Sequence, residues 1–309
     1  MRTAKIRFLE KGEAARLPKG VKLLPKAVQQ KYIETCSPYG LTAEKDMLTG
    51  ILQTDAETGM TQVWRKNAVK LLERLKKEDV EIIIPPIEGE LPQGILPFAD
   101  GRRLTNLFAF KGAAEALKRR GKNPAECSYL LVGGNEDNWR TALTSAGNEM
   151  NHLAIFTLDP DSAKELTQEL FEERGLMTEV FSSPKNQVFR QADVVFGCGM
   201  EQRAYEFMLK DGAVWLDLAG NRPVLRRLME KRSDVVAVDG FFFKKDGLQT
   251  EGRLAEAEAF LSCPIFRENF RFLLAEAVRS EMLCELQEKG YVVSGFSALG
   301  KRVKIRRNP

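Results

Sequence analysis

Tyr129–Asp159 reads YLLVGGNEDNWRTALTSAGNEMNHLAIFTLD, and this stretch decides the fold. An apolar run as far as Val132 leads into Gly133-Gly134, and a stretch with helical periodicity follows. A second apolar run, Leu153–Leu158, then ends at Asp159. Short apolar runs bounded by turn residues are typical of buried strands. The pattern therefore predicts a strand, a glycine-rich turn, a helix and a second strand.

The glycine turn and the acidic residue match two contacts that a dinucleotide makes with such a unit. Glycines allow backbone N–H groups to reach a pyrophosphate at the helix N-terminus, and an acidic residue after the second strand reaches a ribose hydroxyl. Gly133, Gly134 and Asn135 are therefore candidate phosphate contacts. Asp159 is the candidate ribose contact, and its charge favours NAD over a cofactor with a 2′-phosphate.

The phosphate turn departs from the pattern G-x-G-x-x-G. Asn135 and Asn138 stand at the second and third glycine positions, and Glu136 and Asp137 place two carboxylates where an anion would bind. Carboxylates in the first turn of a helix gain roughly 0.3–1 kcal/mol from the helix dipole. A turn capped by its own carboxylates would bind no dinucleotide, so both outcomes stay open.

Strands and helices alternate through the rest of the second half. Further strands are predicted at 178–181, 193–196, 213–218 and 234–238. This alternation predicts an α/β fold with a doubly wound, Rossmann-like parallel sheet. We expect a smaller N-terminal α/β domain over residues 1–123, the nucleotide-binding domain over 124–263, and a C-terminal region over 264–309. That region would hold one long helix, Pro264–Lys289, which returns to the first domain, and a basic tail.

Loops after the strands of an open parallel sheet are where its ligands bind. The loops Gly197–Gln202 and Leu218–Pro223 are therefore candidates, and Asn221 in the second of them is a candidate substrate contact. The segment Pro85–Asp100 holds four prolines and two glycines and is predicted to be irregular. We expect it to form the mouth of the site, with Asp100 and Arg102 at its exit as substrate contacts.

Composition indicates the class of protein and its location in the cell. The chain has 309 residues, of which 43% are hydrophobic and 29% charged, as in soluble globular proteins. It contains neither an apolar run of the roughly 20 residues that a membrane helix needs nor an apolar signal-peptide core. A cytoplasmic location without a membrane partner is expected, with the five scattered cysteines as free, buried thiols.

His152 is the only histidine, which excludes a zinc site built on several histidines, and no metal is expected. Because His152 enters an apolar strand, we interpret it as a structural residue.

The net charge of +4 conceals an asymmetry. Residues 1–125 contain 23 Lys and Arg against 15 Asp and Glu, a balance of +8, whereas the rest of the chain is acidic. This basic excess favours a small anionic substrate near the first domain. Nucleic acid is not expected as a partner, since only the basic tail supports it, and a homodimer stays open.

Three segments resemble known dehydrogenases. ADVVFGCGM, residues 192–200, resembles a strand end of the shikimate dehydrogenases. VWLDLAGNRPVL, residues 214–225, resembles the next strand and loop of shikimate dehydrogenases and glutamyl-tRNA reductases, and Asp239-Gly240-Phe241 resembles their later glycine turn. The likeness spans about residues 105–290. It implies hydride transfer with NAD or NADP, and it places Gly197, Gly199 and Met200 beside the nicotinamide.

No catalytic residue can be assigned from this likeness, because the lysine and aspartate motifs of shikimate dehydrogenases do not occur here. Two classes of function stay open. The first is an NAD(P)-dependent oxidoreductase with a small anionic substrate between two domains. The second is a Rossmann-like protein without a dinucleotide, which would bind S-adenosylmethionine or another nucleotide-like ligand, or act as a non-catalytic partner-binding subunit.

Overall fold

The computed structural model describes residues 2–8, 19–36, 39–44, 47–52, 62–86, 91–144, 146, 149–199, 207–271 and 276–305. The chain folds into two compact units, the first over Met1–Asp100 and the second over Gly101–Pro309. Within the described ranges, no helix has the length and apolar character needed to cross a membrane.

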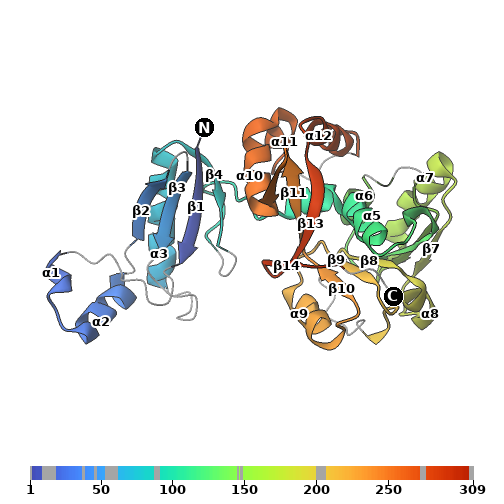
Figure 1. Ribbon diagram of the computed structural model, residues 1–309, viewed down its shortest axis with the longest axis horizontal. Coiled ribbons are helices and arrows are strands. Elements are labelled where there is room, and N and C mark those ends of the chain that lie inside the picture. The colour runs from blue at the N-terminus through green and yellow to red at the C-terminus, as the bar shows by residue number, and fades with distance from the viewer. Residues whose placement is uncertain are drawn as a thin grey trace. The chain divides into compact units, whose positions relative to one another are not determined.

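The first unit is a four-stranded sheet in the order β2-β3-β1-β4 (Figure 1). Strand β1 (Arg2–Phe8) is parallel to β3 (Met47–Leu52) and β4 (Val80–Ile84), and β2 (Tyr39–Glu44) is antiparallel to β3. The helices are α1 (Lys19–Lys22), α2 (Lys26–Cys36) and α3 (Gln62–Lys77). The apolar side of α3 packs in the core of this unit through Ala68, Leu71, Leu72 and Leu75.

The proline-rich segment after β4 is irregular in its described residues, as predicted. Residues 91–100 contain one isolated β-bridge, between Ile83 and Phe98, and no helix or strand. Two hydrogen bonds fix this bridge, from the Ile83 N–H to the Pro97 carbonyl and from the Ala99 N–H to the Ile83 carbonyl.

A six-stranded parallel sheet forms the centre of the second unit, and the six strands predicted from the sequence are confirmed. They are β5 (Ser128–Val132), β6 (His152–Phe156), β7 (Thr178–Phe181), β8 (Val194–Gly197), β9 (Val214–Asp217) and β10 (Val236–Val238). Their order across the sheet is β7-β6-β5-β8-β9-β10. Counted along the chain this is 3-2-1-4-5-6, the doubly wound Rossmann order.

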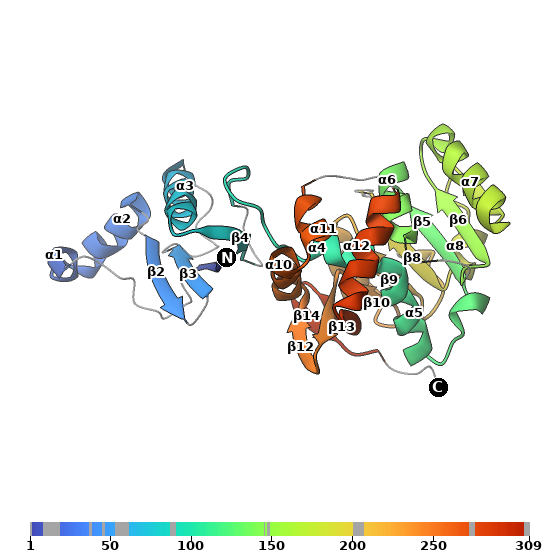
Figure 2. The same ribbon diagram turned by 90° about the horizontal axis from the view of Figure 1, so that it is seen from above.

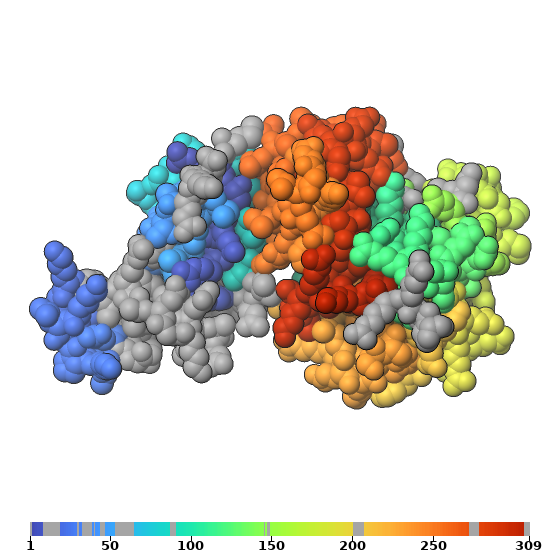
Figure 3. Space-filling model, viewed as in Figure 1, coloured from blue at the N-terminus to red at the C-terminus, as the bar shows by residue number. Residues whose placement is uncertain are grey.

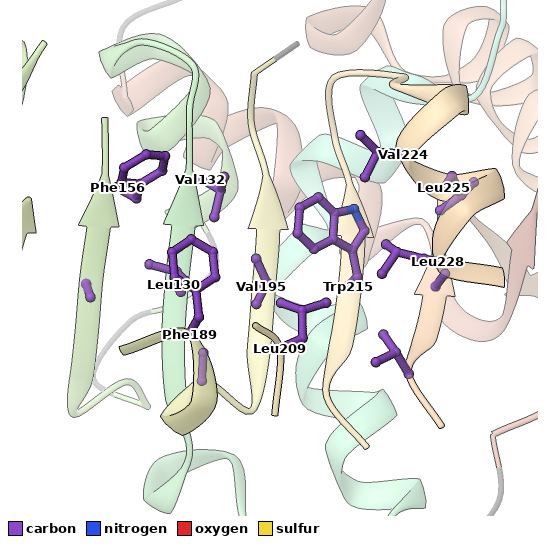
Figure 4. Close-up of a cluster of buried hydrophobic side chains, with 14 of the residues drawn as sticks. Leu130, Val132, Phe156, Phe189, Val195, Leu209, Trp215, Val224, Leu225 and Leu228 are labelled. Atoms are coloured by element: carbon purple, nitrogen blue, oxygen red, sulfur yellow. The ribbon is translucent and has the colours of Figure 1, made fainter. Parts of the chain in front are cut away.

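Helices lie along both faces of this sheet (Figure 1, Figure 2). They comprise α4 (Arg102–Leu107), α5 (Ala109–Arg119), α6 (Glu136–Leu143), α7 (Lys164–Arg174), α8 (Asn186–Gln191) and α9 (Arg222–Lys231), with 3₁₀ turns η1 (Pro124–Glu126) and η2 (Pro160–Ala163). On one face, Phe189 of α8 and Leu225 of α9 pack with Val195 and Trp215 of the sheet (Figure 4). On the opposite face, Phe110 of α5 packs against Tyr129 of β5, with ring centroids 5.3 Å apart.

The C-terminal region differs from the predicted long helix and tail. From Gly240 onward, the elements are β11 (Gly240–Lys245), β12 (Leu248–Glu251), α10 (Gly252–Ser262), α11 (Pro264–Glu268), α12 (Glu276–Glu288), β13 (Val292–Ala298) and β14 (Lys301–Val303). The strands form an antiparallel sheet, β12-β11-β13-β14, and their residues are part of the visible surface of the second unit (Figure 3).

Two sequence predictions are therefore wrong in this region. The helix expected over Pro264–Lys289 is interrupted, since α11 ends at Glu268 and residues 269–271 form a turn. Asp239-Gly240-Phe241, which resembles a glycine turn in the sequence, instead runs into β11, because β13 offers it a pairing partner about 50 residues further along the chain.

Candidate functional site

The turn between β5 and α6 has the conformation that its glycines allow. Gly133 and Gly134 have φ angles of 66° and 81°, in the left-handed region that L side chains rarely adopt. The indole N–H of the fully buried Trp139 donates a 2.7 Å hydrogen bond to the Gly133 carbonyl. A rigid side chain beneath the turn therefore holds it in place.

The N-terminus of α6 is capped by asparagine amides, whereas capping by its own carboxylates was one of the two outcomes that the sequence left open. The Asn138 N–H donates to the Asn135 side-chain oxygen and the Asn135 N–H donates to the Asn138 side-chain oxygen, both at 3.1 Å. The carboxylate of Glu136 instead accepts a 2.7 Å hydrogen bond from Arg140, which also donates to Glu169 of α7.

This arrangement leaves backbone donors available at the helix N-terminus. Within the described chain, the N–H groups of Glu136 and Asp137 donate no hydrogen bond. Free N–H groups in the first turn of a helix are suited to phosphate. The contact with Arg140 also neutralises the charge of Glu136, one of the two carboxylates that would repel a bound anion.

The two glycine loops predicted to bind a cofactor lie against each other. A Cβ atom at Gly199 would be 2.3 Å from the backbone nitrogen of Gly134, and one at Gly134 would be 2.7 Å from the Cys198 carbonyl oxygen. A Cβ atom at Gly197 would be 2.9 Å from the Trp215 ring. The approach of these loops therefore requires glycine. Met200, the remaining predicted nicotinamide contact, lies outside the described residues.

Cys198 is not suited to act as a nucleophile. Burial raises the pKa of the Cys198 thiol, and the Asp217 carboxylate raises it further. The thiol is therefore protonated at neutral pH, whereas a nucleophilic cysteine needs the thiolate. Cys127, Cys198 and Cys263 are free and buried as expected, but the free Cys284 is exposed.

Asp159 follows β6 at the carboxyl end of the sheet. Its side chain is exposed, and its backbone N–H donates to the Thr157 hydroxyl at 3.2 Å. Because β6 pairs with β5, Asp159 and the glycine turn follow neighbouring strands at the same end of the sheet. This is the placement that the ribose contact requires.

A second group of polar residues follows β9 and β10. The guanidinium of Arg102, at the start of α4, lies over Gly220, where a Cβ atom would be 2.6 Å from it. The next residue, Asn221, is buried, and its side-chain oxygen accepts the Val224 N–H at 3.4 Å as the N-cap of α9. Asp100 is the last residue of the first unit, and its contact with a substrate stays a prediction.

Asp217 and Asp239 are functional candidates that the sequence did not single out. Burial raises the pKa of Asp217 to about 6, against the opposing effect of the Asn221 and Ala219 N–H groups. Burial also raises the pKa of Asp239, although its carboxylate accepts the Leu299 N–H at 2.9 Å. The signal in the sequence was an ionisable residue within the apolar run AVWLDL.

The single histidine lies away from these groups. His152 is the first residue of β6 and is exposed at the amino end of the sheet, where it lines a cavity of about 370 Å³. The described ranges also hold no group of three side chains suited to a metal ion. The carboxyl end of the sheet therefore offers glycine turns, helix N–H groups, an arginine and buried carboxylates.

Comparison with known proteins gives no family. No family model matches the sequence, and no curated protein matches it.

Among solved structures, the chain is similar to an L-tryptophan dehydrogenase from Nostoc punctiforme, with 11% identity, coverage of 93% of this chain and 80% of that chain, and a TM-score of 0.38. It is also similar to the shikimate dehydrogenase from Aquifex aeolicus, with 13% identity, 91% and 97% coverage, and a TM-score of 0.36. An archaeal alanine dehydrogenase with bound NAD has 16% identity and a TM-score of 0.29, and the similarity covers 37% of this chain and 34% of that protein's length. At these identities and TM-scores the likeness carries no argument about function.

Proposed function

We propose that the second unit binds NAD or NADP at the carboxyl end of its parallel sheet, and that the protein is an oxidoreductase with a small anionic substrate. One observation carries the proposal. The strand order reverses between β5 and β8, and the two glycine loops follow these two strands. Doubly wound sheets bind their ligands at such a reversal.

The local residues fit the three parts of a dinucleotide. The Glu136 and Asp137 N–H groups would bind the pyrophosphate, with Gly133, Gly134 and Asn135 forming the turn around it. The exposed carboxylate of Asp159 would accept hydrogen bonds from the adenosine ribose. Gly197, Gly199 and Met200 would lie beside the nicotinamide, which gives or accepts a hydride when bound.

The substrate would bind near the nicotinamide end. Gly197 of β8 is paired with Asp217 of β9, so the loop that holds Asn221 begins next to the nicotinamide loop. Arg102 supplies the positive charge that an anionic substrate requires. The assignment of Arg102, Asn221 and Asp100 as substrate contacts belongs to this proposal.

The ribose contact gives a test with a matched control. Asp159→Asn should weaken NADH binding and reduce the preference for NADH over NADPH, because it removes a charged acceptor and the repulsion of a 2′-phosphate. Asp161→Asn removes the same charge from the same loop, where Asp161 is paired with Lys164 in the solvent. Titration of each variant, followed by energy transfer from tryptophan to NADH, measures both affinities. Equal effects of the two substitutions would contradict the proposed ribose contact.

The alternative, a Rossmann-like protein without a dinucleotide, rests on the cap of α6. The side-chain oxygens of Asn135 and Asn138 accept hydrogen bonds from two backbone N–H groups of the turn. The two side chains also stand where the usual motif has glycine. A ligand without phosphates, such as S-adenosylmethionine, would not need these N–H groups. Binding of S-adenosylmethionine without binding of NADH or NADPH would support this alternative.

A further inference from the structure

The carboxylate of Asp217 has an oxygen atom that the fold does not use. Asp217 is 4% exposed at the end of β9. The backbone N–H groups of Asn221 and Ala219 lie near enough to oppose the rise in the pKa of this carboxyl, yet Oδ2 is buried and accepts no hydrogen bond from the described part of the chain. Buried carboxylate oxygens without a donor are costly, so such an atom at a ligand-binding edge points to a donor on the ligand.

A positive charge lies close to this carboxylate without pairing with it. Arg102 attracts Asp217 electrostatically, and its guanidinium lies over Gly220, three residues beyond Asp217. No ion pair found among the described residues includes Asp217, whereas Arg102 has interactions with other residues as well. A cation and a buried anion therefore lie near each other at this end of the sheet.

Charges arranged in this way complement a molecule that carries both an anion and an ammonium group. Arg102 would bind a carboxylate by paired hydrogen bonds, and an ammonium group would supply N–H donors to Asp217. A 2-oxo acid offers the carboxylate but no donor for Oδ2. A 2-hydroxy acid offers a single neutral donor, which forms a weaker hydrogen bond with a carboxylate than an ammonium group does.

We infer that the substrate is a 2-amino acid, a zwitterion whose carboxylate is the anionic group bound by Arg102 and whose ammonium group is bound by Asp217. This inference rests on the proposed oxidoreductase function, because that function places the substrate beside the loop after β8, next to Asp217. The Arg102 side chain is exposed, so a ligand can reach its guanidinium over Gly220.

The test compares matched ligands on the full chain saturated with NADH or NADPH at pH 7.5. Each common L-amino acid is screened by its shift of the melting temperature. Those that bind are compared, by isothermal titration, with the 2-hydroxy acid of the same side chain, for example alanine with lactate. An amino acid should bind at least about tenfold more tightly than its hydroxy acid, as expected for one charged hydrogen bond.

Three variants test which side chains cause the difference in affinity between the amino acid and the hydroxy acid. Asp217→Asn should abolish the preference for the amino acid and leave NADH affinity unchanged. Arg102→Gln should weaken the amino acid and the hydroxy acid equally. Asp246→Asn, in the exposed turn between β11 and β12, should change neither. If Asp217→Asn fails to fold, the comparison of the two ligands on the wild-type protein still tests whether the substrate is a 2-amino acid.

The outcomes separate this inference from the proposed function. NADH or NADPH binding without any amino acid binding, or equal affinities for the matched pair, would overturn the inference and leave the oxidoreductase proposal intact. Loss of NADH affinity in Asp217→Asn with the amino acid preference unchanged would also overturn it. Failure of all dinucleotides to bind would instead refute the proposed function.

Discussion

Single residues at the carboxyl end of the sheet are held in states that cost stability. The raised pKa of Asp217 comes first from burial and is increased by the neighbouring Asp239. A rise from the ordinary value near 4 to about 6 corresponds to on the order of 3 kcal/mol against the ionised form. Destabilised groups of this kind are concentrated in functional sites.

The pKa of Asp217 gives a prediction about the pH dependence of stability. Its folded-state pKa is above the unfolded value, so its stabilising contribution is present below about pH 4 and lost as the pH rises through 6. Asp217→Asn keeps a side-chain oxygen of the same size and removes the charge. Relative to wild type, the variant should therefore gain about 2 kcal/mol between pH 4.5 and pH 8. Urea unfolding at both pH values measures this, and a pH-independent difference would contradict it.

Sequence reasoning located these residues only in part. Gly133, Gly197 and Asp159 were recognised, because turns and strand ends leave local patterns in the sequence. At the opposite, amino end of the sheet, the burial of Asp193 could not be predicted, since it depends on Lys122 and Lys210, which bind the same carboxylate oxygen at 2.6 and 2.8 Å from distant parts of the chain. Contacts between distant residues leave no local pattern.

Strands could be predicted from the sequence where nearly all of their side chains are buried. Strands of a parallel sheet are covered on both faces and therefore appear as continuous apolar runs, which is why β5 to β10 were found. Strand β13 mixes serine and glycine with apolar residues, and its partner β11 ends 47 residues before it begins. Neither feature identifies a strand locally, so the sequence suggested a tail.

The C-terminal strands should be essential to the second unit and not a dispensable tail. Phe296 of β13 is fully buried, 5.9 Å from the Phe241 ring and beneath the Arg119 guanidinium. Phe296→Ala should cost about 3–5 kcal/mol of unfolding free energy, as large-to-small changes in cores do. The control Val292→Ala, at a 61% exposed position of the same strand, should cost less than about 1 kcal/mol. Chemical denaturation of both variants provides the comparison, and equal, small effects would mean that the strand is not part of the folded core.

For the whole molecule, the proposed cofactor site lies in the second unit, and most of the basic excess of residues 1–125 lies there too, because residues 1–100 contain 16 Lys and Arg against 14 Asp and Glu. The basic excess of residues 1–125 supports an anionic substrate, and the role of Pro85–Asp100 as the mouth of the site stays a prediction. Everything proposed about substrate depends on one claim, that the reversal between β5 and β8 binds a dinucleotide.

Isothermal titration of the full chain with NAD, NADH, NADP and NADPH tests this claim most directly. S-adenosylmethionine serves as the ligand that shares the adenosine but lacks the pyrophosphate. The account predicts saturable one-to-one binding of at least one dinucleotide, with NADH favoured over NADPH because of Asp159. Absence of saturable heat from all four dinucleotides at millimolar concentration would contradict it, most clearly if S-adenosylmethionine bound instead.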